Sequence, residues 1–211
     1  MPGLSGIDFC KKVKNDPSIS HIPVILLTAE SSIEKKLEGT EGGADDYMVK
    51  PFEKQLLVAK VASLLKNRTN LQQYFFNEIT LRETHFKIPE EYKTFLEKCI
   101  SVVEKHLDDE DFSVKTLASE LNISHSNLYK KIKSISGQTA NAFIRFIRLR
   151  KAAELLIHIN INVNEAASQV GFTSPKYFRE QFVKLFGMTP SEYIKKYRKP
   201  FGKSYHLNDE K

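Results

Sequence analysis

The side chains in this sequence best suited to chemistry are cationic, aromatic and amide groups that recur in two segments of its second half. The first group is Ser126, Asn127, Tyr129, Lys130 and Lys133, and the second is Lys176, Tyr177, Arg179, Glu180 and Lys184. Arg can bond guanine O6 and N7, Asn can read adenine, Glu can accept from cytosine N4, and Lys and Tyr commonly hold phosphates. The two groups therefore predict contacts with duplex DNA, with simple solvation of each side chain as the alternative.

The charge of the chain is concentrated around these groups. The whole chain carries a net charge of +6, but residues 111–200 alone hold 15 Lys and Arg against 6 Asp and Glu. A concentrated positive field suggests a polyanionic partner, and a solvated basic face is the other interpretation.

The basic segment contains an internal repeat. "VKTLASELNIS" at residues 114–124 matches "VNEAASQVGFT" at residues 163–173, and each copy predicts two short helices around a tight turn. Asn122 marks the first turn and Gly171 the second, while Ser124 in one unit and Thr173 or Ser174 in the other can cap the following helix. The repeat predicts two helix-turn-helix units, with generic helical hairpins as the alternative.

A long helix is expected between the two units, from about residue 140 to 157, with an apolar stripe formed by Phe143, Ile147, Ala152, Leu155 and Leu156. Some 20 helical residues span about 30 Å. Because major-groove openings on one DNA face repeat every ~34 Å, this helix could set two recognition helices into adjacent grooves.

The first third of the chain predicts alternating helices and strands. Pro2, Gly3 and Gly6 suggest a loop before an amphipathic helix, and short apolar runs at 24–27 and 47–49 suggest buried parallel strands. A polar helix is expected around 31–38. A last helix should place Leu57, Val61, Leu64 and Leu65 on one stripe.

The expected domains are residues 1–68, a linker at 69–88, a helical domain at 89–200 and a tail at 201–211. Residues 89–107 predict an acidic amphipathic helix with Phe95, Cys99, Val102 and Val103 inward, preferred as a packing helix over a dimerisation element. Cys10 and Cys99 suit core thiols in a reducing compartment. The sequence predicts no membrane span, secretory signal, metal site or catalytic motif, so neither enzyme activity nor a cofactor is expected.

The first third resembles the receiver domains of two-component response regulators, through "MPGLSGIDF", "PVILLTA" and "GADDYMVKPF". The resemblance implies that Thr28 bonds a phosphoryl oxygen, that Lys50 pairs with the phosphate charge, and that Tyr47 swings inward. It also implies that the phosphoacceptor Asp and the acidic pair for Mg²⁺ lie upstream of Met1. The chain is then expected to lack phosphotransfer, as an excised fragment or a truncated descendant.

Residues 111–198 resemble the AraC/XylS-type DNA-binding domain, most clearly in "EAASQVGFTSPKYFREQFVKLFGMTPSEYI". In many members Ser-Arg follows the buried Phe of the second recognition helix, where this chain has Arg179 and Glu180. The expected fold is an α/β partial receiver with an incomplete parallel sheet, followed by an all-α domain with two helix-turn-helix units joined by a long helix.

Together the two resemblances imply a sequence-specific DNA-binding transcription regulator, the output module of a phosphorelay in the cytoplasm. The arrangement resembles the end of hybrid two-component regulators with a membrane-anchored parent, and a free-standing regulator is the alternative. Expected partners are double-stranded DNA, a histidine kinase in the same or another chain, RNA polymerase, and a second copy of this chain bound through the partial receiver. No contact with a membrane is expected. A protein-binding signalling scaffold without specific DNA binding is the competing function.

Overall fold

The computed structural model describes residues 4–16, 19, 21–29, 42–109 and 111–198. The loop expected at Pro2 and Gly3, the helix expected at 31–38 and the tail expected at 201–211 lie outside the described residues. The chain divides into two compact units, residues 1–102 with 113–144 and residues 103–112 with 145–211. This division reflects which residues pack against one another. The domain boundaries expected from the sequence stay a prediction.

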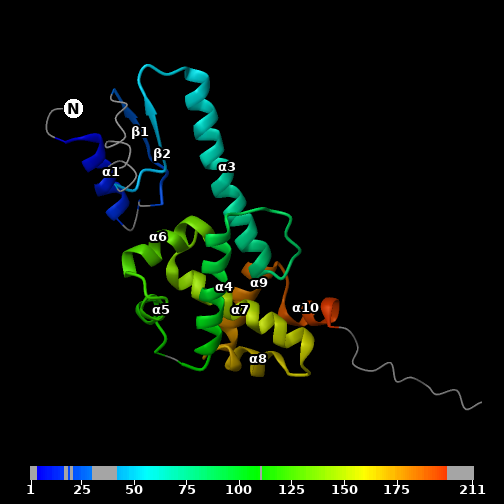
Figure 1. Ribbon diagram of the computed structural model, residues 1–211. Helices are drawn as coiled ribbons and strands as arrows, with labels where there is room; N and C mark the ends of the chain where they lie inside the picture. Colours follow the sequence, from blue (N-terminus) through cyan, green and yellow to red (C-terminus); the bar gives the residue numbers. More distant parts are fainter. Residues whose placement is uncertain (1–3, 17–18, 20, 30–41, 110, 199–211) are drawn as a thin grey trace, which may run out of the picture. The chain divides into compact units, whose positions relative to one another are not determined.

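The N-terminal part is a short parallel sheet with a helix packed on it (Figure 1). Helix α1 (Gly6–Asn15) begins at Ser5, whose hydroxyl accepts from the Asp8 backbone N–H at 3.0 Å. Strand β1 (Ile25–Thr28) pairs in parallel with strand β2 (Asp46–Val49), so both expected strands and their parallel pairing are confirmed. The expectation that they are buried is wrong, because Met48 is the one buried residue of the two strands and Leu27 is 43% exposed. Cys10 of α1 is fully buried, which places the apolar side of α1 inward.

Two ion pairs fix the elements around this sheet. Lys14 of α1 bonds Asp45, just before β2, at 2.6 Å, and Lys60 bonds Asp46 of β2 at the same distance. Lys60 belongs to α3 (Lys54–Ile79), which follows β2 after a short connection. The sheet is therefore held to α1 by both packing and charge, and to α3 by the ion pair of Lys60.

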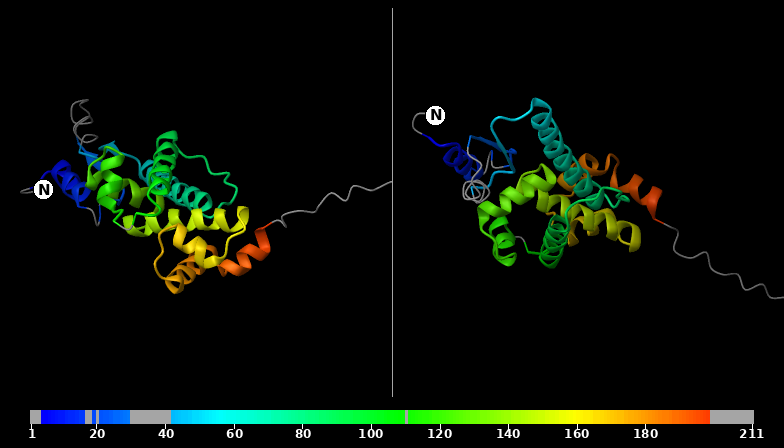
Figure 2. Two further views of the ribbon diagram at one scale, coloured as in Figure 1. Left: turned by 90° about the horizontal axis from the view of Figure 1, so that it is seen from below. Right: turned by 45° about the horizontal axis from the view of Figure 1, so that its top comes forward.

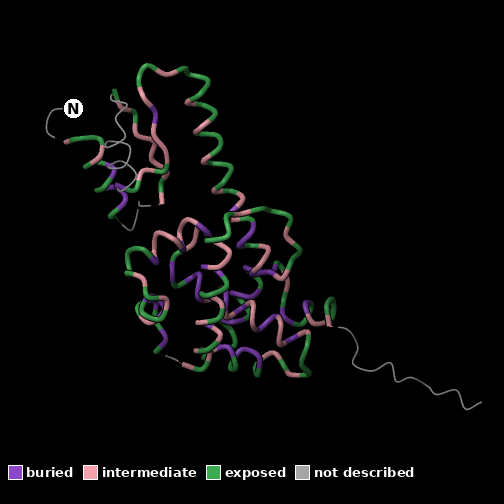
Figure 3. The backbone as a smooth tube through the Cα atoms, viewed as in Figure 1, coloured by how far each residue is buried: buried purple, intermediate pink, exposed green. Residues whose placement is uncertain are grey.

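Helix α3 differs from the expected helix in length and in the face that it buries. It continues past Arg68 to Ile79, so residues 69–79 are helical where an aperiodic linker was expected. Beyond Arg68 its buried side chains are Leu71, Tyr74, Phe75 and Ile79. By contrast Val61 and Leu65 of the expected stripe are 41% and 54% exposed, because the described strands cover little of that face. Figure 3 shows burial along α3 rising toward its C-terminal end.

Helix α4 (Glu90–Lys105) confirms the expected packing helix, with Phe95, Cys99 and Val103 buried and Val102 half-buried. The α3 helix contacts α6 (His125–Ser136), and Phe75 of α3 stacks on Phe143 with ring centres 5.2 Å apart. Both cysteines are free and buried, as expected. Of these buried groups, Phe75, Phe95, Cys99 and Phe143 belong to the first unit and Val103 to the second.

The remaining helices follow the order expected for the repeat. Helix α5 (Val114–Glu120) precedes α6, and α7 (Ala140–His158) is one unbroken helix of 19 residues (Figure 2). It is followed by α8 (Val163–Gln169), α9 (Pro175–Phe186) and α10 (Pro190–Tyr197). On α7 the expected apolar stripe is buried except at Leu155, which is half-buried. The all-α domain is thus confirmed.

Candidate nucleic-acid interface

The first helix-turn-helix unit is built by local signals at its turn. Asn122, between α5 and α6, has φ 53°, the left-handed conformation that asparagine tolerates better than most residues. Ser124 then caps α6, because its hydroxyl accepts from the Asn127 backbone N–H at 3.2 Å. Leu128 and Ile132 are fully buried, so the opposite face of α6 is left for other contacts.

The candidate residues of α6 differ in how accessible they are. Ser126 and Asn127 are exposed, while Tyr129, Lys130 and Lys133 are half-buried. Tyr129 lies edge-on to His125 with ring centres 4.7 Å apart. The Lys133 ammonium donates to the Gly137 carbonyl at 2.9 Å, at the C-terminal end of its own helix, where a positive charge is favourable. Lys133 therefore has a structural contact that sequence reasoning did not anticipate.

The turn of the second unit depends on Gly171 and on an arginine of α7. Gly171 has φ 76°, and Ser174 caps α9 by accepting from the Tyr177 backbone N–H at 3.3 Å. The Arg148 guanidinium donates to the Gly171 carbonyl at 3.1 Å and to the Asp109 carbonyl at 3.2 Å. Burial lowers the pKa of Arg148, although attraction to Asp109 opposes that shift. This arginine ties the turn before α9 to the segment that follows α4.

All five candidate residues of α9 are exposed: Lys176, Tyr177, Arg179, Glu180 and Lys184. Phe178 and Phe182 are fully buried on the opposite face, as expected. The repeat thus presents one polar face on each recognition helix, and the two faces lie in different units of the chain.

Asn164 and Arg145, which the sequence analysis did not identify, each form a hydrogen bond with a candidate residue of α9. The Arg179 Nη2 donates to Asn164 Oδ1 of α8 at 2.8 Å, and the Arg145 Nη1 of α7 donates to the Tyr177 hydroxyl at 3.0 Å. No ion pair joins Arg179 and Glu180 in the described part of the chain, which agrees with neighbouring helical residues facing apart. Because the Tyr177 oxygen accepts from Arg145, its own hydrogen is left to donate to another acceptor, such as a phosphate oxygen.

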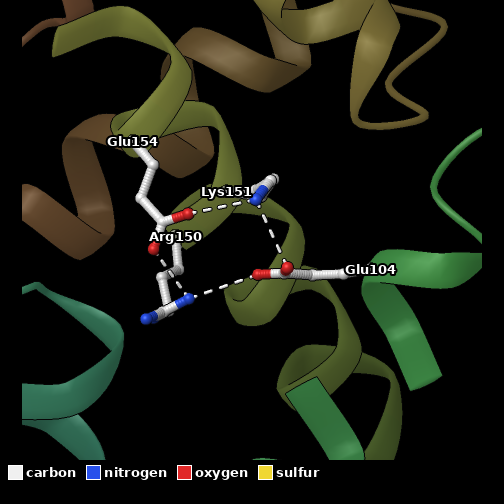
Figure 4. Close-up of polar contacts among 4 residues, drawn as sticks. All are labelled: Glu104, Arg150, Lys151 and Glu154. Atoms are coloured by element: carbon white, nitrogen blue, oxygen red, sulfur yellow. Dashed lines mark hydrogen bonds and ion pairs between the residues drawn. The ribbon is translucent and has the colours of Figure 1, made fainter. Parts of the chain in front are cut away.

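Part of the basic charge near these helices is neutralised internally. Arg150 bonds Glu154 at 2.8 Å and Glu104 at 3.2 Å, and Lys151 bonds both carboxylates at 3.3 Å (Figure 4). Burial lowers the pKa of Lys151, but the two carboxylates outweigh it and leave that pKa above its ordinary value. Two of the cations counted in the basic segment therefore stabilise the end of α4 against α7.

Two of the three candidate receiver residues, Thr28 and Lys50, lie at the C-terminal ends of the paired strands. Thr28 ends β1, Tyr47 lies within β2, and Lys50 directly follows β2. The Lys50 backbone N–H donates to the Thr28 carbonyl at 2.6 Å, which brings these two residues together. In the described ranges no group of His, Cys, Asp and Glu could hold a metal ion, and no helix there is long and apolar enough to cross a membrane.

Two models of known families match separate parts of the chain. Residues 1–62 match the model of the response regulator receiver domain, and residues 117–196 match the model of a helix-turn-helix domain. Each recognition helix described above lies inside the second match.

Individual proteins show the same two similarities. Histidine kinase P4 of Formosa agariphila is 40% identical over 201 residues, which are 95% of this chain and 15% of that protein. The response regulator PleD of Caulobacter vibrioides is 42% identical over 66 residues, covering 31% of this chain and 14% of PleD. The C-terminal domain of AraT, a response regulator from Geobacillus stearothermophilus, is 27% identical and aligns with 54% of this chain and 93% of that domain at a TM-score of 0.44.

Proposed function

Since this chain joins a response regulator receiver domain at residues 1–62 to an AraC-type helix-turn-helix domain at residues 117–196, we propose that it is the DNA-binding output module of a two-component system. It would bind double-stranded DNA sequence-specifically and regulate transcription in the cytoplasm, with RNA polymerase as a further partner. The observation that carries the proposal is the pair of capped recognition helices, each with an apolar face buried and a polar face accessible.

The α7 helix supports binding to two adjacent grooves. Its 19 residues give a length of about 28 Å, close to the ~34 Å between major-groove openings on one face of DNA. One rigid helix between the two helix-turn-helix units would therefore fix the spacing of the two DNA half-sites that a single chain binds.

The receiver part supports a signal supplied by a histidine kinase. Thr28 and Lys50 are joined through the backbone at the strand ends, and we assign Thr28, Tyr47 and Lys50 to the response to a phosphoryl group. The relative from Formosa agariphila is named a histidine kinase, which favours a kinase in the same polypeptide over one in another chain. We propose that this longer polypeptide is anchored in the inner membrane. Intact mass after incubation with acetyl phosphate tests the expectation that this chain itself takes no phosphoryl group at a receiver aspartate, and a stoichiometric, acid-stable and base-labile adduct would contradict it.

The proposed DNA binding is tested by equilibrium binding of the full chain to a randomised duplex library over a range of salt concentrations. Several phosphate contacts predict a steep fall in affinity with salt. A flat or absent response would instead favour the protein-binding scaffold.

Two substitutions separate the expected roles of the recognition helices. Arg179 has the bidentate fork that suits a guanine edge, so Arg179→Ala should cost about 1–3 kcal/mol on the selected site and flatten discrimination at one base pair. Lys130→Ala should weaken all sequences alike and lower the salt slope by about one, as expected for a phosphate contact. A uniform loss for Arg179→Ala, with every base preference kept, would remove its assignment as a base reader.

A further inference from the structure

The contact between Arg179 and Asn164 gives the second recognition helix a feature that the first one does not share among the described contacts. Arg179 extends from α9, and its Nη2 donates to Asn164 Oδ1 at 2.8 Å. Both residues are exposed, so the bond lies at the surface of the unit rather than within its core. An exposed arginine is ordinarily free to sample many rotamers, and this bond restricts that freedom.

The position of Asn164 is itself fixed by the start of α8. Asn162 caps that helix, and its Oδ1 accepts from the backbone N–H groups of Asn164 and Glu165, each at 2.9 Å. The Glu165 carboxylate accepts in turn from the Asn162 backbone N–H at 2.9 Å, which completes a capping box. The Asn164 backbone is therefore held at the capped start of α8, so its side chain extends from a fixed point toward Arg179.

The bond to Asn164 uses only one of the five N–H donors of the Arg179 guanidinium. The remaining donors include pairs with the fork geometry that reads guanine O6 and N7. A guanidinium that is already oriented loses less conformational freedom when it binds a base. The neutral amide of Asn164 also orients Arg179 without the repulsion from phosphates that a carboxylate would bring.

On these grounds we propose that Asn164 is a positioning residue that presets Arg179 for reading a base edge. The inference rests on the proposed DNA binding and concerns the same face of α9. Asn164 does not itself contact the base; it acts through the arginine.

The test measures binding of the full chain to a selected duplex, to a mismatched duplex and to a randomised duplex library. Asn164→Ala should lower affinity for the selected site about two- to tenfold, the range expected when one side chain is no longer pre-ordered. Discrimination at the base pair read by Arg179 should fall, while binding to mismatched duplexes stays near the wild-type level. Ser168→Ala, an exposed substitution on the same helix, is the matched control and should change neither quantity.

Two further variants isolate the positioning role. Asn164→Asp keeps an oxygen acceptor, so base preference should be retained although the added negative charge weakens binding to every duplex. In the Arg179→Ala background, Asn164→Ala should have no additional effect, because the group that it positions is gone. Thermal unfolding followed by circular dichroism checks that each variant is folded. Because Asn164 is exposed, we expect its substitutions to leave the fold intact.

The outcomes distinguish this inference from the proposed function. A wild-type chain that binds all duplexes alike would overturn the proposed sequence-specific binding itself. If the wild type discriminates but Asn164→Ala binds and discriminates like it, or binds more tightly, the inference is wrong and the proposed function stands. The inference is equally wrong if Arg179→Ala keeps every base preference, or if Asn164→Ala still weakens binding in the Arg179→Ala background.

Discussion

Replacing Gly171 by alanine should strongly destabilise the second helix-turn-helix unit. Gly171 has φ 76°, and a Cβ placed there would lie 2.4 Å from the Leu107 carbonyl oxygen and 2.5 Å from the Arg148 Nη1. The first of these atoms belongs to the backbone, so it cannot be relieved by a change of rotamer. The second belongs to the guanidinium that bonds the Gly171 carbonyl.

The expected loss of stability has two parts. The left-handed conformation costs an alanine about 1–2 kcal/mol relative to glycine. Displacing Arg148 would also weaken its bond to the Gly171 carbonyl, and a hydrogen bond from a charged donor contributes about 1.5–3 kcal/mol. The sum is about 2.5–5 kcal/mol, which is a large share of the stability of a domain of ordinary size.

Gly187 provides a matched control in the same unit. It follows α9 with φ 73°, but nothing lies within 4 Å of a Cβ placed there. Gly187→Ala should therefore show only the backbone cost of about 1–2 kcal/mol. Urea unfolding followed by circular dichroism gives the free energy of unfolding of both variants, and the difference between them isolates the crowding at Leu107 and Arg148. If Gly171→Ala is no less stable than Gly187→Ala, the crowding has no energetic consequence and the reasoning is refuted.

Three further predictions concern buried and paired groups. Burial raises the pKa of the Cys99 thiol to about 12, so Cys99 should resist alkylation in the folded chain at pH 8 and react only on unfolding; rapid labelling of native protein would contradict this. Because the folded pKa is raised, the contribution of Cys99 to stability should be complete below about pH 8.5 and decline as the pH rises toward 12, whereas a Cys99→Ala variant should lack that decline. Glu104→Gln removes the carboxylate shared by Arg150 and Lys151 and should lower the free energy of unfolding by about 1 kcal/mol at low salt and by less at high salt, measured by urea unfolding, and a loss independent of salt would argue against an electrostatic role.

Much of the helical part could be read from the sequence because its signals are local. Ser124 and Ser174 cap the helices expected to follow them, and Asn122 and Gly171 adopt the positive φ that their turns require. A cap or a left-handed turn depends on residues within a few positions, so one stretch of sequence is enough to specify it. The paired strands of the sheet were likewise indicated by short apolar runs.

Only the tertiary structure decided which distant residues meet. Sequence periodicity did not reveal that α3 continues to Ile79, because the side chains that bury its second half lie elsewhere in the chain. The partners of the α9 side chains are also long-range: Asn164 is 15 residues from Arg179, and Arg145 is 32 residues from Tyr177. Such pairs depend on where packed helices cross, and that geometry is set by the whole core rather than by the residues at either end of the bond. The sequence alone therefore determined which residues face outward on each recognition helix, and the packing of α7, α8 and α9 determined which of them are held in place.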